Sequence, residues 1–443
     1  MVLDRQSLLK MPICNRFYAL PLNNFTLLCM ILILAMQSLQ VYAADTDEIA
    51  SNVLSLSEAI QRTFNNNPEL QTFQYTLEAQ QGRVVQADLA TKPKLKLQLE
   101  DALGTGEYQV FDSAETTLSI SWVLDKAIRE KRTAVAFQGI SVIESEKAIK
   151  RLDSATQTAH YFIQVLSYQE RVVIAKLAIT LAETTVKEIK KRVKVGKTLQ
   201  AELYRAEAEL AKRRLVLLDL KHEIKSLHRQ LAAQWGSSKP GFSSVSGSLT
   251  QLPSVIDFQS LNAQIKHNPN LSKYLSQQRV TEASLQLAKQ QRNIQWSFTS
   301  GIKHYAEDND VGIVAGFSIP LGISNRNQGR IAEIQANIAK NQSEAEALRI
   351  RIETSLFVFY EQLKHGIHLS ELLKEEVIPR LEKALKATHK AYEVGRYSYL
   401  EWLSVQNELL DAQSALLNAS LAAHQNKIEI ERLTGAHLNT SFK

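Results

Sequence analysis

Two histidines form the pair whose residue type and spacing most resemble a metal site. His365 and His368 lie three residues apart in a segment with helical periodicity, so both imidazoles would project from one helix face. No carboxylate follows at a matching spacing, and the sequence contains no HExxH motif, no glycine-rich phosphate loop and no Ser or Cys nucleophile signature. We therefore expect no metal site, no cofactor and no enzymatic activity.

The N-terminal segment has the three parts of a secretory signal peptide. Three basic residues precede an apolar core of about 12 residues at 25–36, which is followed by the small-x-small sequence Val41-Tyr42-Ala43. Met11 is a second possible start, and a retained N-terminal anchor is the alternative. All cysteines and methionines fall within residues 1–43, so the exported chain would have no disulfide, thiolate ligand or soft Cu(I) ligand.

The composition favours long helices and gives no indication of nucleic-acid binding. The chain has 443 residues, with 52 Lys and Arg against 46 Asp and Glu, and these charges are interspersed rather than grouped. Only 16 glycines and 9 prolines are present, and no proline occurs between Pro93 and Pro240. So few helix breakers argue against a fold with many turns.

The chain after the signal peptide contains a long repeat. Asn67-Pro68 recurs as Asn268-Pro269 after 201 residues, and Val195-Gly196-Lys197 recurs as Val394-Gly395-Arg396 after 199 residues. We therefore expect five parts: a signal peptide (1–43), a first repeat (44–235), a linker (236–253), a second repeat (254–435) and a C-terminal tail (436–443).

Each repeat is predicted to contain two short helices, two strands, a very long helix and a return helix after a glycine turn. The long helices would run from about residue 128 to 195 and from 328 to 394, or roughly 100 Å each at 1.5 Å per residue. The return helices carry heptad stripes, of which one steps through Leu409, Ala412 and Leu416. A second stripe, offset by one position, predicts a neighbour on each side, as in a helical barrel; an ordinary antiparallel coiled coil is the alternative.

Four segments alternate apolar residues with small or polar ones, which is the pattern of tilted transmembrane strands. They are residues 94–101, 116–124, 294–305 and 311–321. Trp122, Trp296 and Tyr305 are candidates for the aromatic girdle at the membrane surface. Soluble hairpins are the alternative for any one pair of strands.

Four strands cannot close a barrel in lipid, because single-chain barrels start at about eight strands. Several chains must then share one barrel, and a trimer would supply twelve strands. The predicted fold is thus mainly α with a small β part: a trimeric α-helical barrel continuous with a 12-stranded transmembrane β-barrel. Export followed by such strands indicates the bacterial outer membrane, with the helices extending into the periplasm.

The same segments resemble the TolC-like outer-membrane efflux channel family. The resemblance rests on the repeat, the two Asn-Pro openings, residues 192–210 (RVKVGKTLQAELYRAEAEL) and, above all, residues 391–406 (AYEVGRYSYLEWLSVQ). The ending at 431–435 (ERLTG) is most similar to the branch that serves heavy-metal pumps of the cobalt–zinc–cadmium type.

The resemblance implies a passive exit duct, with divalent heavy-metal cations as the expected substrates. Its implied partners are two further copies of the chain, a periplasmic adaptor (membrane fusion protein), an inner-membrane pump of the resistance-nodulation-division type, and outer-membrane lipid. The closed periplasmic tip would open when adaptor and pump dock. A duct for drugs or for type I protein secretion, and a periplasmic coiled-coil adaptor or scaffold, are the alternatives.

The resemblance also implies roles at the hairpin tips. Gly196 with Lys197, and Gly395 with Arg396, would contact the adaptor. Glu401, six residues after Gly395, would form an acidic ring that attracts cations at the periplasmic gate, and Glu202 is its counterpart in the other repeat. Ser404 occupies the place of a second acid. A solvated acid and simple turn chemistry are the alternative interpretations.

Overall fold

The computed structural model describes residues 53–320 and 327–436, which belong to one compact unit. The predicted signal peptide, residue 321 of the last predicted strand and residues 437–443 of the predicted tail lie outside the described residues. The described chain is mostly helical with a small sheet, as the sequence predicts.

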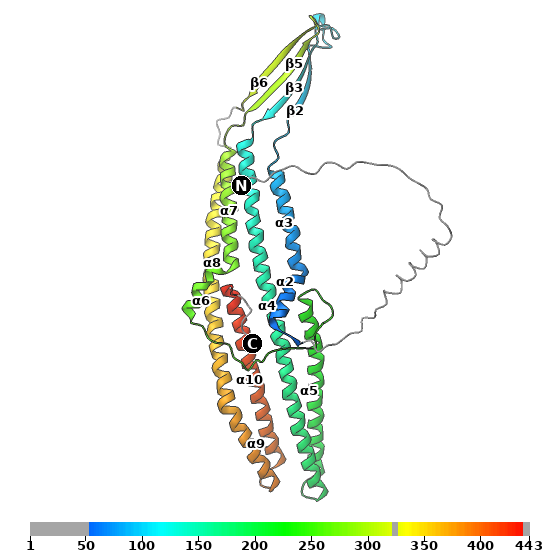
Figure 1. Ribbon diagram of the computed structural model, residues 1–443, viewed down its shortest axis with the longest axis vertical. Helices are drawn as coiled ribbons and strands as arrows, with labels where there is room; N and C mark the ends of the chain where they lie inside the picture. Colours follow the sequence, from blue (N-terminus) through cyan, green and yellow to red (C-terminus); the bar gives the residue numbers. More distant parts are fainter. Residues whose placement is uncertain (1–52, 321–326, 437–443) are drawn as a thin grey trace, which may run out of the picture. The chain divides into compact units, whose positions relative to one another are not determined.

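The same order of elements occurs twice along the chain (Figure 1). The first set is α2 (Leu56–Asn66), α3 (Pro68–Ala87), β2 (Lys94–Glu100), β3 (Glu115–Val123), α4 (Lys126–Lys194) and α5 (Gln200–Ala233). The second set is α6 (Phe258–Gln264), α7 (Pro269–Gln290), β5 (Ser297–Tyr305), β6 (Asp310–Ser318), α8 (Gln328–Leu372), α9 (Ile378–Glu393) and α10 (Tyr399–Thr434).

The two long helices differ in continuity. Helix α4 runs unbroken for 69 residues, about 100 Å at 1.5 Å per residue. Its counterpart is interrupted between α8 and α9 by a π-helical turn, Leu373–Val377. Pro379 follows this turn, lacks a backbone N–H and would clash with the carbonyl four residues earlier in a regular helix. The wider turn accommodates the proline, a local feature that differs from the predicted uninterrupted helix.

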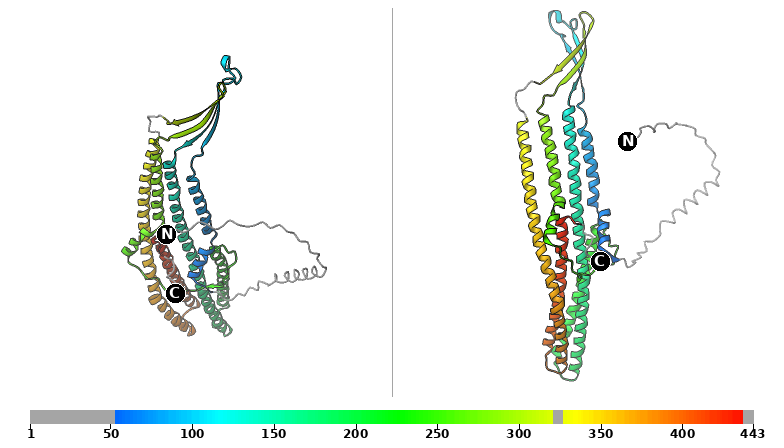
Figure 2. Two further views of the ribbon diagram at one scale, coloured as in Figure 1. Left: turned by 45° about the horizontal axis from the view of Figure 1, so that its top comes forward. Right: turned by 60° about the vertical axis from the view of Figure 1, so that its left-hand side comes forward.

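The helices lie side by side as a wall, as the views in Figure 2 show. Near the sheet the order across the wall is α3, α4, α7, α8, and towards the hairpin tips it is α5, α4, α10, then α8 and α9. Helix α4 therefore has neighbours on both flanks along its whole length. The wall has two free margins: α3 and α5 form one, and α8 with α9 forms the other.

Residues 236–253, predicted as a linker, contribute to the core. Strand β4 (Ser244–Val245) pairs in parallel with β1 (Val53–Leu54), and Leu249 is fully buried. These residues pack against Phe162 and Leu231 in the largest apolar cluster. A second cluster joins α6, α8 and α10, and a third lies at the hairpin tips.

The four longer strands form one antiparallel sheet in the order β2-β3-β5-β6. Strands β3 and β5 come from different repeats, so the sheet joins the two halves of the chain. Strands β2 and β6 are its edge strands. No helix in the described part of the chain carries an apolar stretch that could span a bilayer.

Candidate functional sites in the sheet and at the hairpin tips

One face of the sheet is apolar and exposed. The register places four apolar side chains in a row across all four strands: Leu97, Leu118, Ile302 and Ile313, which are 70%, 48%, 58% and 87% exposed. The opposite face carries Thr117 and Ser119 and an ion pair between Glu115 and Lys303. An exposed apolar face on an antiparallel sheet with a polar reverse face is the pattern of a lipid-facing strand set.

A row of aromatic side chains crosses the same face at the end of the sheet next to the helices. Ring centroids are 6.1 Å apart between Trp122 and Phe298, and 5.1 Å apart between Phe298 and Phe317. Trp296 lies beside this row, and its carbonyl accepts the N–H of Leu124 at 2.9 Å. Phe298 and Phe317 were not among the predicted girdle residues, although strand alternation places them on the same face as Trp122.

Tyr305 lies on the other face of the sheet, which differs from the predicted girdle position. It pairs in register with Glu115, and the ammonium of Lys303 lies 5.2 Å from its ring centroid. A Cβ added at Gly312 would lie 3.3 Å from the Tyr305 ring, so the ring covers this glycine. Side chains alternate between the faces of a strand, and an odd-numbered residue in β5 therefore faces away from Phe298 and Ile302.

Both hairpin tips turn at a glycine in the left-handed region. Gly196 has φ +70° and Gly395 has φ +79°. The N–H of the next residue, Lys197 or Arg396, donates to the carbonyl oxygen five residues earlier at 2.9 Å in each case. This is the Schellman motif that ends many helices, and it requires φ values that favour glycine. No neighbouring atom lies within 4 Å of a Cβ added at either glycine. Glycine is therefore needed for its positive φ angle and not for lack of space.

Glu401 caps the return helix α10. Its carboxylate oxygen Oε2 accepts the Ser398 N–H at 2.7 Å and the Ser398 hydroxyl at 2.9 Å, and the Glu401 N–H donates to Ser398 Oγ at 3.3 Å. This capping box, readable as Ser-x-x-Glu in the sequence, was missed in the sequence analysis. The two donors of Ser398 lower the pKa of Glu401, so the exposed side chain is held as an anion.

Glu202 has a related position at the start of α5. Its carboxylate accepts a hydrogen bond from the hydroxyl of Thr198 in the tip loop. Both tip acids are thus in the first turn of a return helix and are oriented by a hydroxyl from the preceding loop. The N-terminal end of a helix favours a negative charge, which accounts for these positions without a further ligand.

The two hairpins are joined near their tips by a residue that the sequence analysis did not select. The Arg192 guanidinium donates through Nη2 to the carbonyl oxygens of Tyr392 at 2.5 Å and Glu393 at 2.6 Å. Its Cζ lies 4.2 Å from the Tyr392 ring centroid, and that ring stacks on Trp402 with centroids 5.0 Å apart. These partners lie about 200 residues from Arg192, which explains why local sequence gave no signal.

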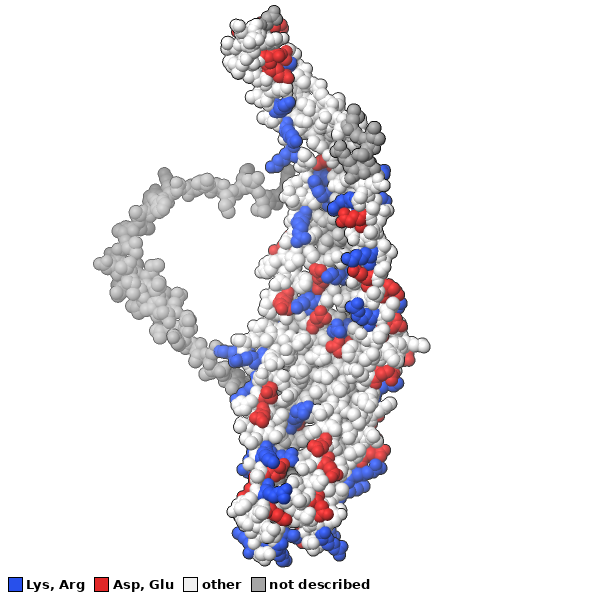
Figure 3. All heavy atoms as spheres, turned by 180° about the vertical axis from the view of Figure 1, so that it is seen from behind, with Lys and Arg blue, Asp and Glu red and all other residues white. Residues whose placement is uncertain are grey.

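Charged side chains are distributed unevenly over the surface. On the face shown in Figure 3, blue and red residues mix along the helices, whereas most of the sheet is white. Lys and Arg gather at the hairpin tips, where the first tip has the sequence KKRVKVGK at 190–197. The tips therefore present a basic surface to any partner.

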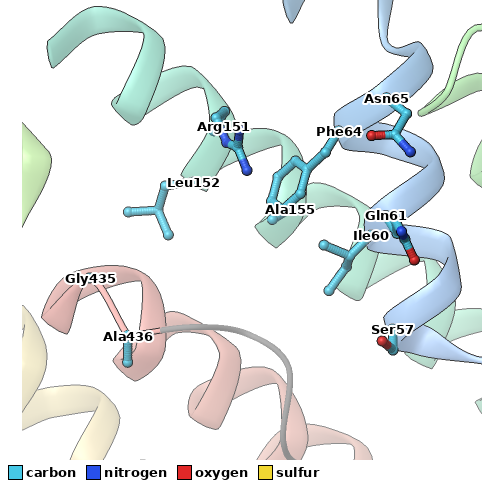
Figure 4. Close-up of a pocket in the computed structure, with 10 residues that line it drawn as sticks. All are labelled: Ser57, Ile60, Gln61, Phe64, Asn65, Arg151, Leu152, Ala155, Gly435 and Ala436. Atoms are coloured by element: carbon cyan, nitrogen blue, oxygen red, sulfur yellow. The ribbon is translucent and has the colours of Figure 1, made fainter. Parts of the chain in front are cut away.

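Two other features carry no chemistry that points to catalysis. His365 and His368 are exposed on α8, and the described residues contain no group of three or more His, Cys, Asp or Glu side chains arranged to hold a metal ion. A cavity of about 450 Å³ lies between α2, α4 and the end of α10 (Figure 4). Its one charged lining residue, Arg151, is 4.3 Å from the Phe64 ring centroid.

Residues 261–436 match the family described as outer membrane efflux protein. This part of the chain is similar to outer membrane efflux proteins. The predicted resemblance to the outer-membrane efflux channel family is thereby confirmed, and so is the predicted localisation in the outer membrane. Proteins of this family are described as outer membrane efflux proteins.

Three relatives extend this outer membrane efflux protein match over most of the chain. The cobalt-zinc-cadmium resistance protein CzcC of Cupriavidus metallidurans is 26% identical over 386 residues, covering 87% of this chain and 91% of CzcC. The crystal structure of the outer membrane protein VceC of Vibrio cholerae has a TM-score of 0.69 at 17% identity, covering 86% of this chain and 96% of VceC. The structure of CusC has a TM-score of 0.68 at 15% identity, covering 90% of this chain and 96% of CusC. The chain therefore has the fold of VceC and CusC.

Proposed function

We propose that three copies of this chain form an exit duct through the outer membrane, with a 12-stranded barrel in lipid and a helical barrel in the periplasm. The observation that carries the proposal is the four-stranded sheet, whose edge strands β2 and β6 are open while one face presents the exposed apolar row. Open sheet edges are not stable in lipid, so further copies must pair with them. The helical wall likewise has two free margins with exposed apolar side chains, among them Leu215 and Val216 on α5 and Phe357 on α8.

The duct conducts passively, and its substrates are divalent heavy-metal cations. Support for this substrate class comes from the similarity to CzcC, a cobalt-zinc-cadmium resistance protein. The exposed Glu401 carboxylates, held as anions by Ser398, would form a ring that attracts cations at the periplasmic gate, with Glu202 nearby. Conduction needs no catalytic group.

The tips dock a periplasmic adaptor, which connects the duct to an inner-membrane pump of the resistance-nodulation-division type. Gly196, Lys197, Gly395 and Arg396 form the outermost turns, and the basic segment at 190–197 favours an acidic adaptor surface. A role as a periplasmic adaptor or scaffold is less compatible with the match to an outer membrane efflux family. Ducts for drugs or for proteins would share the same architecture.

Cysteine pairs across the two edge strands test the assembly. Residues 44–443 contain no cysteine, so any disulfide in this part of the chain must join the introduced cysteines. Gln98→Cys on β2 is combined in turn with Gly312→Cys, Val314→Cys and Gly316→Cys on β6, all on the polar face. We expect one of these registers to give a covalent trimer in the outer-membrane fraction, with each single variant as control. A monomer in every combination, or a chain recovered in the soluble periplasmic fraction, contradicts the proposal.

A further inference from the structure

A cavity of about 490 Å³ lies where α3 ends and the chain leads into β2. Arg83, Lys92 and Arg132 surround it, together with the apolar side chains of Leu89 and Ala90. Lys92 is two residues before the start of β2, and Lys94 pairs with Ser121, next to the aromatic row. The cavity is therefore at the level where the lipid-facing sheet gives way to the helices (Figure 1).

Two of the three cationic groups of this cavity, Arg83 and Arg132, are held in place by uncharged acceptors. Arg132 donates through Nε to the carbonyl of Ala87 at 2.8 Å and through Nη2 to the carbonyl of Leu89 at 2.7 Å, which fixes the end of α3. Arg83 donates to the side-chain oxygen of Gln80 at 2.7 Å. Within the described residues, none of the three cations forms an ion pair with a carboxylate.

The nearby carboxylates form no ion pair with these three cations, although Asp125 is bonded to Thr91, which also lines the cavity. Asp125 accepts the hydroxyl of Thr91 at 2.6 Å and its N–H at 3.0 Å. Asp88 lies 3.7 Å from Arg129 on α4. The cavity thus keeps a net positive charge next to an apolar wall, and a ligand with a phosphate group and a hydrocarbon part would complement both.

We infer that this cavity binds the anionic headgroup of a phospholipid from the periplasmic leaflet of the outer membrane. The inference rests on the proposed function, because it takes the level of the aromatic row as the membrane surface. Basic clusters next to a membrane-spanning element attract anionic headgroups, and a guanidinium binds phosphate through paired hydrogen bonds. Each protomer of the trimer has one such cavity.

The periplasmic leaflet is favoured over the outer leaflet by the position of the cavity along the strands. Residues Tyr305 and Asp310 mark the opposite end of the sheet, at the β5–β6 turn. Lipopolysaccharide, whose phosphates lie in the outer leaflet, would meet that end. A phosphate bound next to Lys92 therefore belongs to the leaflet on the helical side.

Lipid binding to the purified, delipidated trimer in detergent tests the inference by native mass spectrometry. The probes are phosphatidylglycerol, phosphatidylcholine and lipopolysaccharide, each added alone. The test variant is R83Q/K92Q, which spares Arg132 because that side chain also fixes the end of α3. The control is K225Q/R229Q, which removes two cations from α5, far along the chain from the cavity.

We expect the wild type and the control to retain phosphatidylglycerol in preference to phosphatidylcholine, up to three molecules per trimer. Loss of two cations should weaken phosphatidylglycerol binding by about 30-fold in the test variant. Equal binding of both phospholipids, unchanged binding by R83Q/K92Q, or preferential binding of lipopolysaccharide overturns the inference. The proposed trimeric duct is judged separately, since its failure would show as a wild type that gives no trimer, whichever lipid is added.

Discussion

The Arg192 guanidinium and the Tyr392 residue join the two helical hairpins at their tips. Arg192 belongs to α4, and it both donates to the Tyr392 carbonyl and lies over the Tyr392 ring. Tyr392 is 3% exposed, whereas Arg192 is half-buried and its hydrogen bond to the Glu393 carbonyl is exposed, so water is excluded only on the side of the Tyr392 ring. Separation of the hairpins has to break this contact.

Arg192→Gln should make the periplasmic tip easier to open. The change removes a cation–π contact and two charged hydrogen bonds, each worth roughly 1.5–3 kcal/mol. We expect an increase of at least about tenfold in mean conductance in planar bilayers, with a smaller increase for Arg192→Lys. Arg214→Gln is the matched control, because Arg214 pairs with Glu183 at 2.9 Å within the first hairpin. Equal conductance of R192Q and wild type would show that the contact does not limit opening.

Glu401→Gln and Ser398→Ala separate the electrostatic role of Glu401 from its capping role. Both changes weaken the capping box, which should cost about 0.5–2 kcal/mol in stability. Only Glu401→Gln removes the negative charge, so only this variant should lose cation preference in reversal-potential measurements. Equal selectivity of the two variants removes Glu401 from the gate.

Asn268→Ala should lower the melting temperature of the purified protein in detergent. The Asn268 side chain accepts the N–H of Asn270 at 2.8 Å and donates to the Leu433 carbonyl at 2.9 Å, so it both starts α7 and holds the end of α10. Losing a helix cap and a buried hydrogen bond should cost roughly 2–3 kcal/mol. Asn337→Ala, on the exposed side of α8, serves as the control. Asn67→Ala should resemble Asn268→Ala, since Asn67 bonds to Gln234 in the same way.

Gly435→Ala should destabilise the protein, whereas Gly82→Ala should not. Gly435 has φ +70°, and an added Cβ would lie 2.8 Å from the His267 carbonyl oxygen. The backbone conformation alone costs alanine roughly 1–2 kcal/mol, and the close contact adds to it. Gly82 is in the exposed part of α3 with no atom within 4 Å of an added Cβ, so alanine there should stabilise by roughly 0.5–1 kcal/mol. Thermal unfolding of the two variants side by side measures the difference, and equal melting temperatures would contradict the prediction.

Acid should weaken the link between α4 and α10. Glu429 accepts a bond from His160 at 2.8 Å and from Arg432 at 2.7 Å, and these partners lower its pKa. A lowered pKa in the folded state gives stability that is complete above the unfolded value of about 4.3 and is lost as pH falls through the folded value. The melting temperatures of wild type and Glu429→Gln should therefore differ at pH 7 and converge only as the pH falls through the lowered folded-state pKa of Glu429. Glu361→Gln, which affects an exposed pair, is the control; a difference that persists at low pH contradicts this assignment.

The sequence predicted helices and strands well wherever the pattern that indicates them lies within a few neighbouring residues. Alternation of apolar side chains located the strands and the face that carries Ile302 and Ile313, and Asn-Pro marked the starts of α3 and α7. The same alternation would have placed Tyr305 on the polar face, and Ser-x-x-Glu would have identified the cap at Glu401. Pro379 is present in the sequence, but whether it breaks the long helix or produces a π-helical turn depends on how the backbone relaxes around it.

Contacts between distant segments could not be predicted in this way. Asn268 bonds to a carbonyl 165 residues away, and Arg192 reaches Tyr392 across 200 residues. Every residue has a backbone carbonyl, so the residue type does not show which carbonyl will accept a hydrogen bond from a distant side chain. The cavity at Lys92 could not be predicted from the sequence either, because Arg83 and Arg132 come together only when α3 packs on α4.

The pairing of β3 with β5 has a consequence for biogenesis. Each half of the chain supplies one hairpin, and these hairpins become neighbours only after both halves have crossed the inner membrane. Neither half can therefore complete the four-stranded sheet without the other. Fragments split within residues 236–253 would have to be exported together to give a working channel.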